Sequence, residues 1–217
     1  EADYADASAR ARRRLVRIDH GFQPKHGRLD RSAARRTLGL PADMPLLGSA
    51  ARLHPAKNLA AAVRLLAVEP GWHLAIAGQG AEAEALRALA ESLGAGGRLH
   101  FVGELLPERL AEFLRALDVF VFPSHLETFG LAAVEAAHAG VPVVSNDLPV
   151  LREVLSVEGK PAALFVDAVD TAAFAAAVRR ALSGDDVVQA IVERGRRLDQ
   201  RYSLDAMTDA YARLLIG

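Results

Sequence analysis

The sequence predicts an α/β fold in which one Rossmann-like parallel sheet of about six strands is doubly wound, with helices on both faces. Two observations support this. From residue 45 onward, apolar runs of about five residues alternate with longer segments rich in Ala, Leu, Arg and Glu, which is typical of a parallel sheet covered by helices. The chain has 217 residues, 51% of them hydrophobic, enough for one large domain with a substantial core but not for two full domains.

Strands are expected where short β-branched or aromatic runs are bounded by turn residues. These runs occupy residues 46–50, 72–77, 98–102, 119–122, 141–145 and 163–166. Helices are expected at about residues 57–68, 81–93, 107–116, 129–139, 150–155, 171–182, 187–198 and 204–215. The last three helical segments have no strand between them, so they should cap one side of the domain or cross over to another.

Residues 1–40 differ from the rest and are expected to be a linker or edge segment, with the domain proper at 41–217. Residues 9–17 are basic, 15–18 could form an edge strand, and 19–29 have the composition of a loop. The basic run could meet anionic lipid or nucleic acid. Acidic residues flank it and no aromatic residues alternate with it, which favours a solvated linker. Because the first residue is Glu rather than Met, we expect sequence to be missing upstream.

Charge and composition exclude several classes of function. A net charge of −1 gives no general attraction to nucleic acid. The lack of cysteine excludes disulfides and thiolate metal sites. No apolar stretch approaches the ~20 residues that span a bilayer, and the start has no signal-peptide pattern, so we expect a cytosolic setting.

The most informative stretch is residues 123–144, PSHLETFGLAAVEAAHAGVPVV, in which Glu127 and Glu135 are eight positions apart. Glu127 precedes a Phe-Gly turn that follows a predicted strand, and a helix is expected to begin near Phe129 or Gly130 and to carry Glu135. Ligands of parallel sheets bind beyond the carboxyl ends of the strands. Eight helical residues span about 12 Å, and the helix N-terminus between the two acids suits a phosphate. Carboxylates accept hydrogen bonds from hydroxyls, so the pattern fits a nucleotide sugar, although a solvated pair of glutamates has the same spacing.

Two cations follow the first predicted strand. Arg52 and Lys57 lie in residues 49–59, SAARLHPAKNL, in a loop that opens a helix. Arginine grips phosphate oxygens in a bidentate fork and lysine acts as a compact point charge, so the pair could neutralise a diphosphate leaving group. Taken alone, two such residues are also compatible with a solvated surface.

Residues 77–83, AGQGAEA, give a loose form of the dinucleotide fingerprint through Gly78 and Gly80, and Glu104 could act as its ribose acid. The match is weak because Glu82 and Glu84 would repel a pyrophosphate, and because this is the second strand–helix turn rather than the first.

Metal ligands and nucleophile motifs are missing: the sequence has no Asp-x-Asp, no His-x-x-x-His and no G-x-S-x-G. Asn146 and Asp147, after another strand, could line the rim of the site or simply form a turn.

The motifs PS-x-x-E-x-F-G and E-A-x-x-x-G-x-P-V-V resemble the signature of the retaining glycosyltransferases of family 4 (group 1), which have the GT-B architecture. The segment around Arg52 and Lys57 matches the R-L-x-x-x-K element of that family, with Ala51 where Gly is more usual. The resemblance extends over about residues 18–215, and it implies the C-terminal, donor-binding half of such an enzyme.

The resemblance also implies roles for individual residues. Arg52 and Lys57 would hold the donor diphosphate, and Glu127 the hydroxyls of the donor sugar. Glu135 would bind the ribose. The remaining contacts would come from the amides of Phe129, Gly130 and Leu131, from the loop of Gly78 and Gly80 at the cleft edge, and from Gly103 and Glu104 near the base. The reaction would pass a glycosyl group from a UDP-, GDP- or ADP-sugar to an acceptor hydroxyl with retention, using no metal or other cofactor.

The family carries its acceptor site on an N-terminal domain, which we expect as a partner of this chain. The isolated chain should bind nucleotide sugar but transfer sugar poorly, and the full-length enzyme could associate peripherally with the inner membrane. Two other hypotheses stay open. The chain could be a non-catalytic nucleotide-sugar-binding module, or a nicotinamide-dependent Rossmann enzyme that binds its cofactor through Gly78 and Gly80.

Overall fold

The computed structural model describes residues 16–23 and 26–216. The described residues divide into two compact units, one formed by residues 26–198 and the other by residues 16–23 together with 199–216. The larger unit contains the whole six-stranded sheet and all the residues singled out for nucleotide-sugar binding.

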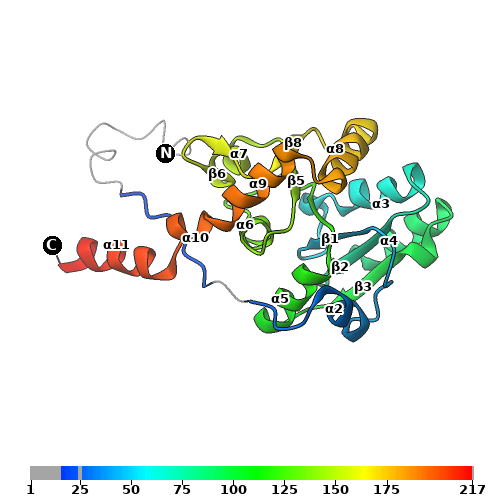
Figure 1. The fold of residues 1–217 in the computed structure, drawn as a ribbon, viewed down its shortest axis with the longest axis horizontal. Helices are drawn as coiled ribbons and strands as arrows, with labels where there is room; N and C mark the ends of the chain where they lie inside the picture. The colour runs from blue at the N-terminus through cyan, green and yellow to red at the C-terminus, as the bar shows by residue number, and fades with distance from the viewer. Residues whose placement is uncertain (1–15, 24–25, 217) are drawn as a thin grey trace. The chain divides into compact units, whose positions relative to one another are not determined.

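The sheet of the larger unit is parallel throughout, with the strand order β3-β2-β1-β4-β5-β8. Its strands are β1 (Leu46–Ala50), β2 (His73–Ala77), β3 (Leu99–Gly103), β4 (Val119–Phe122), β5 (Val143–Asn146) and β8 (Leu164–Val166) (Figure 1). From β1 the chain adds β2 and β3 on one side of the sheet, and it then returns to add β4, β5 and β8 on the other side. This is the doubly wound arrangement, so the predicted fold class is confirmed.

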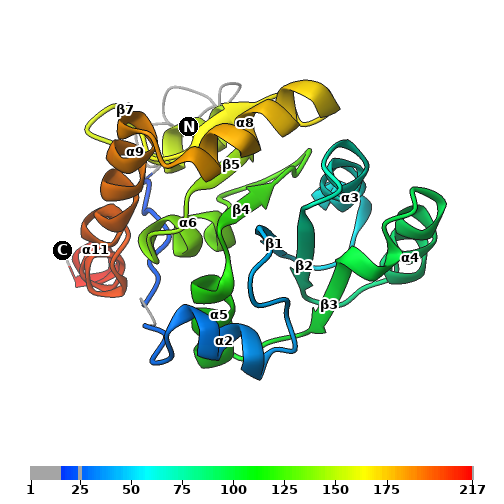
Figure 2. The same cartoon turned by 45° about the vertical axis from the view of Figure 1, so that its right-hand side comes forward.

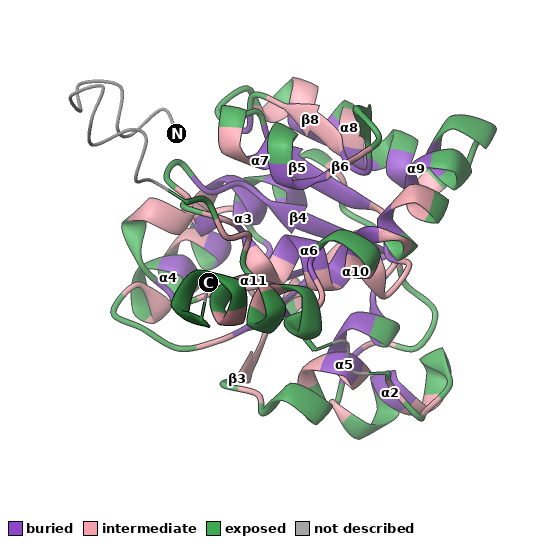
Figure 3. Cartoon of the chain, turned by 90° about the vertical axis from the view of Figure 1, so that its left-hand side faces the viewer, coloured by how far each residue is buried: buried purple, intermediate pink, exposed green. Residues whose placement is uncertain are grey.

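Helices cover both faces of the sheet (Figure 2). On one face α3 (Leu59–Val68), α4 (Ala83–Ser92) and α8 (Thr171–Ser183) form a continuous apolar core with β1, β2, β4 and β5. The other face carries α2 (Arg31–Thr37), α5 (Pro107–Ala116) and α6 (Leu131–His138). The larger unit also contains α7 (Pro149–Val154), α9 (Asp186–Arg196) and the short antiparallel pair β6 (Ser156–Val157) and β7 (Lys160–Pro161). Figure 3 shows β4 and β5 as buried, as expected for strands covered on both faces.

All six predicted strands and all eight predicted helices are present, with shifts at their ends. The helix predicted from residue 57 begins at Leu59, because a 3-10 turn (η2, Pro55–Lys57) precedes it and Asn58 adopts a left-handed conformation with φ 48°. That backbone conformation is incompatible with a right-handed helix interior. The strand predicted from residue 141 begins two residues later, after Pro142.

Helix α2 was not predicted, and it lies within the segment expected to be a linker or edge segment. Asp30 caps the helix by accepting a 2.8 Å hydrogen bond from Ala33 N. Arg35 is only 2% exposed and donates to Asp118 Oδ2 at 2.8 Å and to Ala116 O at 2.8 Å. Helix α2 is therefore built into the larger unit.

The smaller unit joins the N-terminal segment to the last helices, α10 (Leu198–Arg201) and α11 (Leu204–Ile216). Phe22 N donates to Tyr202 O at 2.8 Å, and Phe22 forms a single parallel bridge with Ser203. The edge strand predicted at residues 15–18 is wrong for its described part, 16–18, and residue 15 lies outside the described residues. Most of the basic run also lies outside them. Among the helices of the described residues, none is both long and apolar enough to cross a bilayer.

Candidate functional site

Two loops that carry predicted site residues meet at the carboxyl edge of the sheet. One follows β1 and contains Arg52 and Lys57; the other follows β4 and contains Glu127. Strands β1 and β4 are neighbours, and the strand order changes direction between them. In doubly wound sheets this position is where ligands bind, because the connections leave the two strands toward opposite faces and open a crevice.

Lys57 and Glu127 are in direct contact. Lys57 Nζ lies 2.6 Å from Glu127 Oε1, although the two residues are 70 positions apart in the sequence. The Glu127 side chain is 8% exposed and that of Lys57 is 26% exposed, so water screens this pair less than a surface ion pair. The resemblance implied that both residues hold the same donor, but the sequence did not predict that they pair with each other.

Two further hydrogen bonds join the same loops. Asn58 Nδ2 donates to Pro123 O at 3.2 Å, and His125 N donates to Ala56 O at 2.9 Å. The side chain of Asn58 can reach across because its own backbone is left-handed, which turns the chain between η2 and α3. These contacts fix the position from which Lys57 meets the loop after β4.

A hollow of about 430 Å³ lies beside these loops, over the carboxyl ends of β1, β2 and β3. The exposed side chain of Arg52 lines it and has no hydrogen-bond or ion-pair partner among the described residues. Its other walls come from the strand ends, from α5 and from the first turn of α6, and comprise Ala50, Ala51, Ala77, Gly78, Gln79, Glu104, Leu105, Leu110 and Ala132. The hollow therefore combines an available cation with an apolar floor.

Glu135 lies on α6 one turn after Ala132, so the two residues share a face of that helix. Glu135 is half-buried, and burial raises the pKa of its carboxyl because it disfavours the charged form. The part of the chain that the structure describes gives this carboxyl no hydrogen bond or ion pair. A half-buried acid without a donor is suited to accept hydrogen bonds from ligand hydroxyls.

The N-terminus of α6 also faces this edge of the sheet. Gly130 caps the helix with φ 88°, a conformation that favours glycine. Its carbonyl accepts hydrogen bonds from Ala133 N and Val134 N, while the N–H groups of Leu131 and Ala132 have no backbone acceptor among the described residues. Such free N–H groups at a helix N-terminus attract anions. Phe129, just before the cap, is half-buried.

The two glycines of the loose dinucleotide fingerprint serve loop packing. A Cβ added at Gly78 would meet the backbone of Ala51, and one added at Gly80 would meet the backbone of Leu53. The loop is held in place by the hydrogen bond from Leu53 N to Gln79 O at 3.0 Å. Close approach of two backbones thus explains both glycines without a bound dinucleotide. Gly78 lines the hollow, whereas Gly80 is not among its lining residues.

The predicted base segment lies on the far side of the same hollow. Gly103 O accepts from Gly78 N at 2.7 Å, which ties the end of β3 to the loop after β2. Glu104 lines the hollow and accepts a hydrogen bond from the side-chain amide of Gln79.

Asn146 holds the loop after β4 in place, a role that the sequence analysis did not distinguish from lining the site or forming a turn. It is 8% exposed; its Nδ2 donates to Ser124 O at 2.9 Å, and its Oδ1 accepts from Ala168 N at 3.0 Å. Asn146 therefore anchors the loop that carries Glu127 to the loop after β8. The sequence feature that could have predicted this role is a polar residue at the end of a buried strand. Its neighbour Asp147 is exposed and pairs with Arg152 instead.

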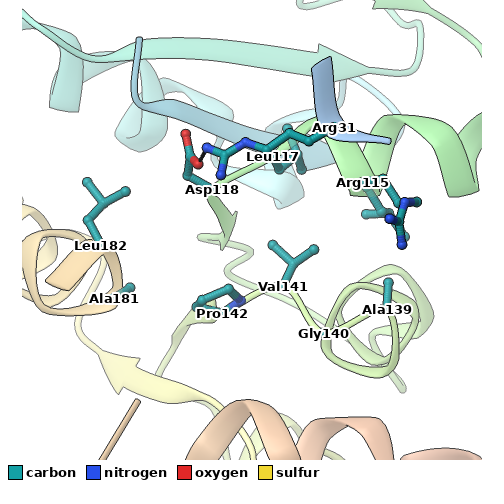
Figure 4. A pocket seen from close by; sticks show the side chains of 11 residues that line it. Arg31, Arg115, Leu117, Asp118, Ala139, Gly140, Val141, Pro142, Ala181 and Leu182 are labelled. Carbon is teal, nitrogen blue, oxygen red and sulfur yellow. Dashed lines mark ion pairs between the residues drawn. The ribbon is translucent and has the colours of Figure 1, made fainter. Parts of the chain in front are cut away.

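A second hollow, of about 390 Å³, lies at the amino ends of β4 and β5, the opposite edge of the sheet from these loops (Figure 4). In it, Arg31 and Asp118 form an ion pair. None of the predicted donor-site residues lines this hollow. Among the described residues, no group of three or more His, Asp and Glu side chains is placed to hold a metal ion.

Residues 30–198 match the family model of the glycosyl transferases group 1. The chain belongs to this family. It is 37% identical over 179 residues to a D-inositol 3-phosphate glycosyltransferase of Acidothermus cellulolyticus, an alignment that covers 76% of the chain and 39% of that protein. It is 34% identical over 182 residues to the lipopolysaccharide core biosynthesis glycosyltransferase LpsE of Rhizobium meliloti, covering 83% of the chain and 52% of that protein. The chain thus spans about two fifths to one half of these relatives.

Solved structures of glycosyltransferases share the fold. Sucrose-phosphate synthase from Thermosynechococcus elongatus superposes with a TM-score of 0.77 at 27% identity, covering 93% of this chain and 51% of that one. HepE from Anabaena, solved in complex with UDP and glucose, superposes with a TM-score of 0.82 at 22% identity, covering 92% of this chain and 56% of that one.

Proposed function

We propose that this group 1 glycosyl transferase chain is the donor-binding domain of a retaining, metal-independent enzyme of family 4. The enzyme would move a glycosyl group from a nucleoside diphosphate sugar to an acceptor hydroxyl. The observation that carries the proposal is the meeting of Lys57 and Glu127 where the strand order reverses, beside a hollow lined by Arg52. Cations and an acid are thereby placed together at the ligand-binding edge of the sheet.

The charge of each site residue indicates which part of the donor it would bind. Arg52 and Lys57 hold the diphosphate, and the free N–H groups at the start of α6 add partial positive charge. Glu127 accepts hydrogen bonds from the donor sugar, and Glu135 from the ribose. These positive groups can neutralise the leaving diphosphate, which is the task that a metal ion performs in other transferases.

The base would extend over the ends of β2 and β3. From β1 to β3 is two strand spacings, about 10 Å, which is a suitable span from a phosphate held by Arg52 to a base beyond the ribose. The hollow offers Leu105 and Leu110 as apolar surface and Gln79 with Glu104 as hydrogen-bonding groups. UDP-, GDP- and ADP-sugars are the candidate donors, and UDP, found in the HepE complex, is the first to test.

The proposal extends to what lies beyond this chain. An N-terminal GT-B domain would supply the acceptor site, so the isolated chain should bind donor and transfer sugar poorly. The complete enzyme is proposed to act in the cytosol, with peripheral attachment to the inner membrane where its acceptor is lipid-linked. Adding the upstream domain should restore transfer. If binding persisted and transfer remained absent, the alternative of a non-catalytic nucleotide-sugar module would be favoured.

A thermal-shift panel tests the proposal. The chain is heated with UDP, GDP, ADP, their glucose or mannose conjugates and NADH, each at high concentration, since stabilisation grows as RT ln(1 + [L]/Kd) and weak binders register. We expect stabilisation by a nucleoside diphosphate and its sugar conjugates that share one base. Stabilisation by NADH alone, lost on Gly80→Leu, would favour the nicotinamide alternative; no stabilisation by any nucleotide would contradict both.

A further inference from the structure

The ion pair between Lys57 and Glu127 gives the site a property beyond donor binding. We propose that Glu127 makes the site discriminate against the free nucleoside diphosphate and in favour of the nucleotide sugar. The proposal rests on the proposed function, because it assigns Lys57 to the diphosphate. It adds a role for Glu127 in product release to the contact with the donor sugar that the proposed function gives this residue.

The contact distance limits how far a bound phosphate can be from Glu127. Lys57 Nζ lies 2.6 Å from Glu127 Oε1. A phosphate oxygen that accepts a hydrogen bond from the same ammonium group lies about 2.8 Å from Nζ. The phosphate oxygen is then at most about 5.4 Å from the carboxylate oxygen, the sum of two charge-assisted hydrogen bonds. Any anion that uses Lys57 therefore approaches a like charge.

The surroundings keep this repulsion effective. The Glu127 side chain is 8% exposed, so little water screens its charge. Lys57 is its single charged partner within the part of the chain that the structure describes. Lys57 also cannot move fully to the phosphate, because that would leave a nearly buried carboxylate unpaired. Its three N–H donors allow it to contact both anions at once.

The two ligands differ at this position. The terminal phosphate of a free nucleoside diphosphate carries more negative charge than the same phosphate esterified to a sugar. The ester also brings hydroxyl groups, and Oε2 of Glu127 has no donor among the described residues. The carboxylate therefore repels the product more strongly and accepts hydrogen bonds from the donor. The result is selective weakening of product binding.

The test is calorimetric titration of the full chain with a nucleoside diphosphate and with its sugar conjugate, using the base that binds. Glu127→Gln removes the charge and keeps the size of the side chain. It should tighten the free diphosphate about tenfold and leave the nucleotide sugar unchanged or weaker. Glu127→Asp keeps the charge and should not tighten the diphosphate. Glu193→Gln, which neutralises an exposed acid on α9, is the control for net charge and should change neither affinity.

Each outcome separates the two proposals. If the wild-type chain binds neither ligand, the proposed function fails and this inference with it. If the ligands bind but Glu127→Gln does not shift the ratio of their affinities toward the free diphosphate, the inference is overturned and donor binding stands. Should the Gln variant not fold, as judged by circular dichroism, Glu127→Ala supplies a second neutral variant, for which the same shift is expected and its absence is equally damaging.

Discussion

The side-chain amide of Asn58 donates a 3.2 Å hydrogen bond to the carbonyl oxygen of Pro123, joining the loop after β1 to the loop after β4. Asn58 is left-handed, with φ 48° and ψ 38°, and it directly follows Lys57. The residue therefore has two separable tasks: it sets the backbone turn into α3, and it holds the loop of Lys57 against that of Glu127.

Asn58→Gly is expected to keep the turn and lose the hydrogen bond. Glycine adopts positive φ readily, so the melting temperature should fall by only a few degrees. Nucleoside diphosphate affinity should fall severalfold because Lys57 is less well positioned. Asn58→Val provides the comparison: a β-branched residue is strained at positive φ, and about 1–2 kcal/mol of stability should be lost. Equal stability of the two variants in urea denaturation would contradict this account of the turn.

Removing the charge of Glu135 should stabilise the unliganded chain at neutral pH. Burial raises the pKa of Glu135 above its ordinary value of 4.5, so the folded state binds its proton more tightly than the unfolded state. The carboxyl therefore favours folding at low pH, and this contribution is lost as the pH rises above about 4.5 through the raised folded pKa.

Glu135→Gln eliminates that titration. In urea denaturation the variant should be more stable than wild type at pH 7, and the difference should shrink toward pH 4. Its nucleotide affinity should be lower, since the amide is a poorer acceptor for ribose hydroxyls. A wild-type protein that is more stable at neutral pH than the variant would mean that the carboxyl has a stabilising partner.

Arg52→Ala should weaken nucleotide binding without affecting the fold. The guanidinium is exposed and has no partner among the described residues, so its removal should change the stability by less than about 0.5 kcal/mol. Loss of a charge-assisted contact to phosphate should reduce the affinity about tenfold or more. Arg64→Ala, at an exposed position on α3, is the matched control and should leave the affinity unchanged. Titration calorimetry compares the two.

Gly130→Ala should be strongly destabilising. The position has φ 88°, and an added Cβ would contact Leu151 Cδ2 and lie 3.3 Å from Phe122 Cε1. Backbone strain and crowding together should cost about 2–4 kcal/mol. Gly39→Ala separates the two causes, because Gly39 has φ 66° with nothing within 4 Å of the added Cβ. Only the strain, about 1 kcal/mol, is expected there. Thermal melts that show equal losses would exclude the crowding.

The sheet was predictable because its central strands are buried on both faces and have short β-branched or aromatic sequences, as in residues 119–122. The gathering of Lys57 and Glu127 followed from the rule that the carboxyl ends of parallel strands share one edge. Their direct contact did not follow, because it depends on the left-handed turn at Asn58 and on strand order. Helix α2 was missed because Arg35 and its neighbours resemble a solvated segment. Arg35 is buried because it pairs with Asp118, 83 residues away in sequence, and donates to the backbone carbonyls of Ala116, Ala42 and Met44.

The most direct test of the central claim is to map nucleotide binding by amide chemical-shift changes on the isotopically labelled chain. Titration with a nucleoside diphosphate sugar should shift the amides of residues 51–58 and 129–135 most strongly, together with those of residues 78–79 and 103–105 at the base end. Shifts confined to the amino edge of the sheet around Arg31, Asp118 and Pro142, or no saturable shifts with any nucleotide sugar, would contradict a donor site at the junction of β1 and β4.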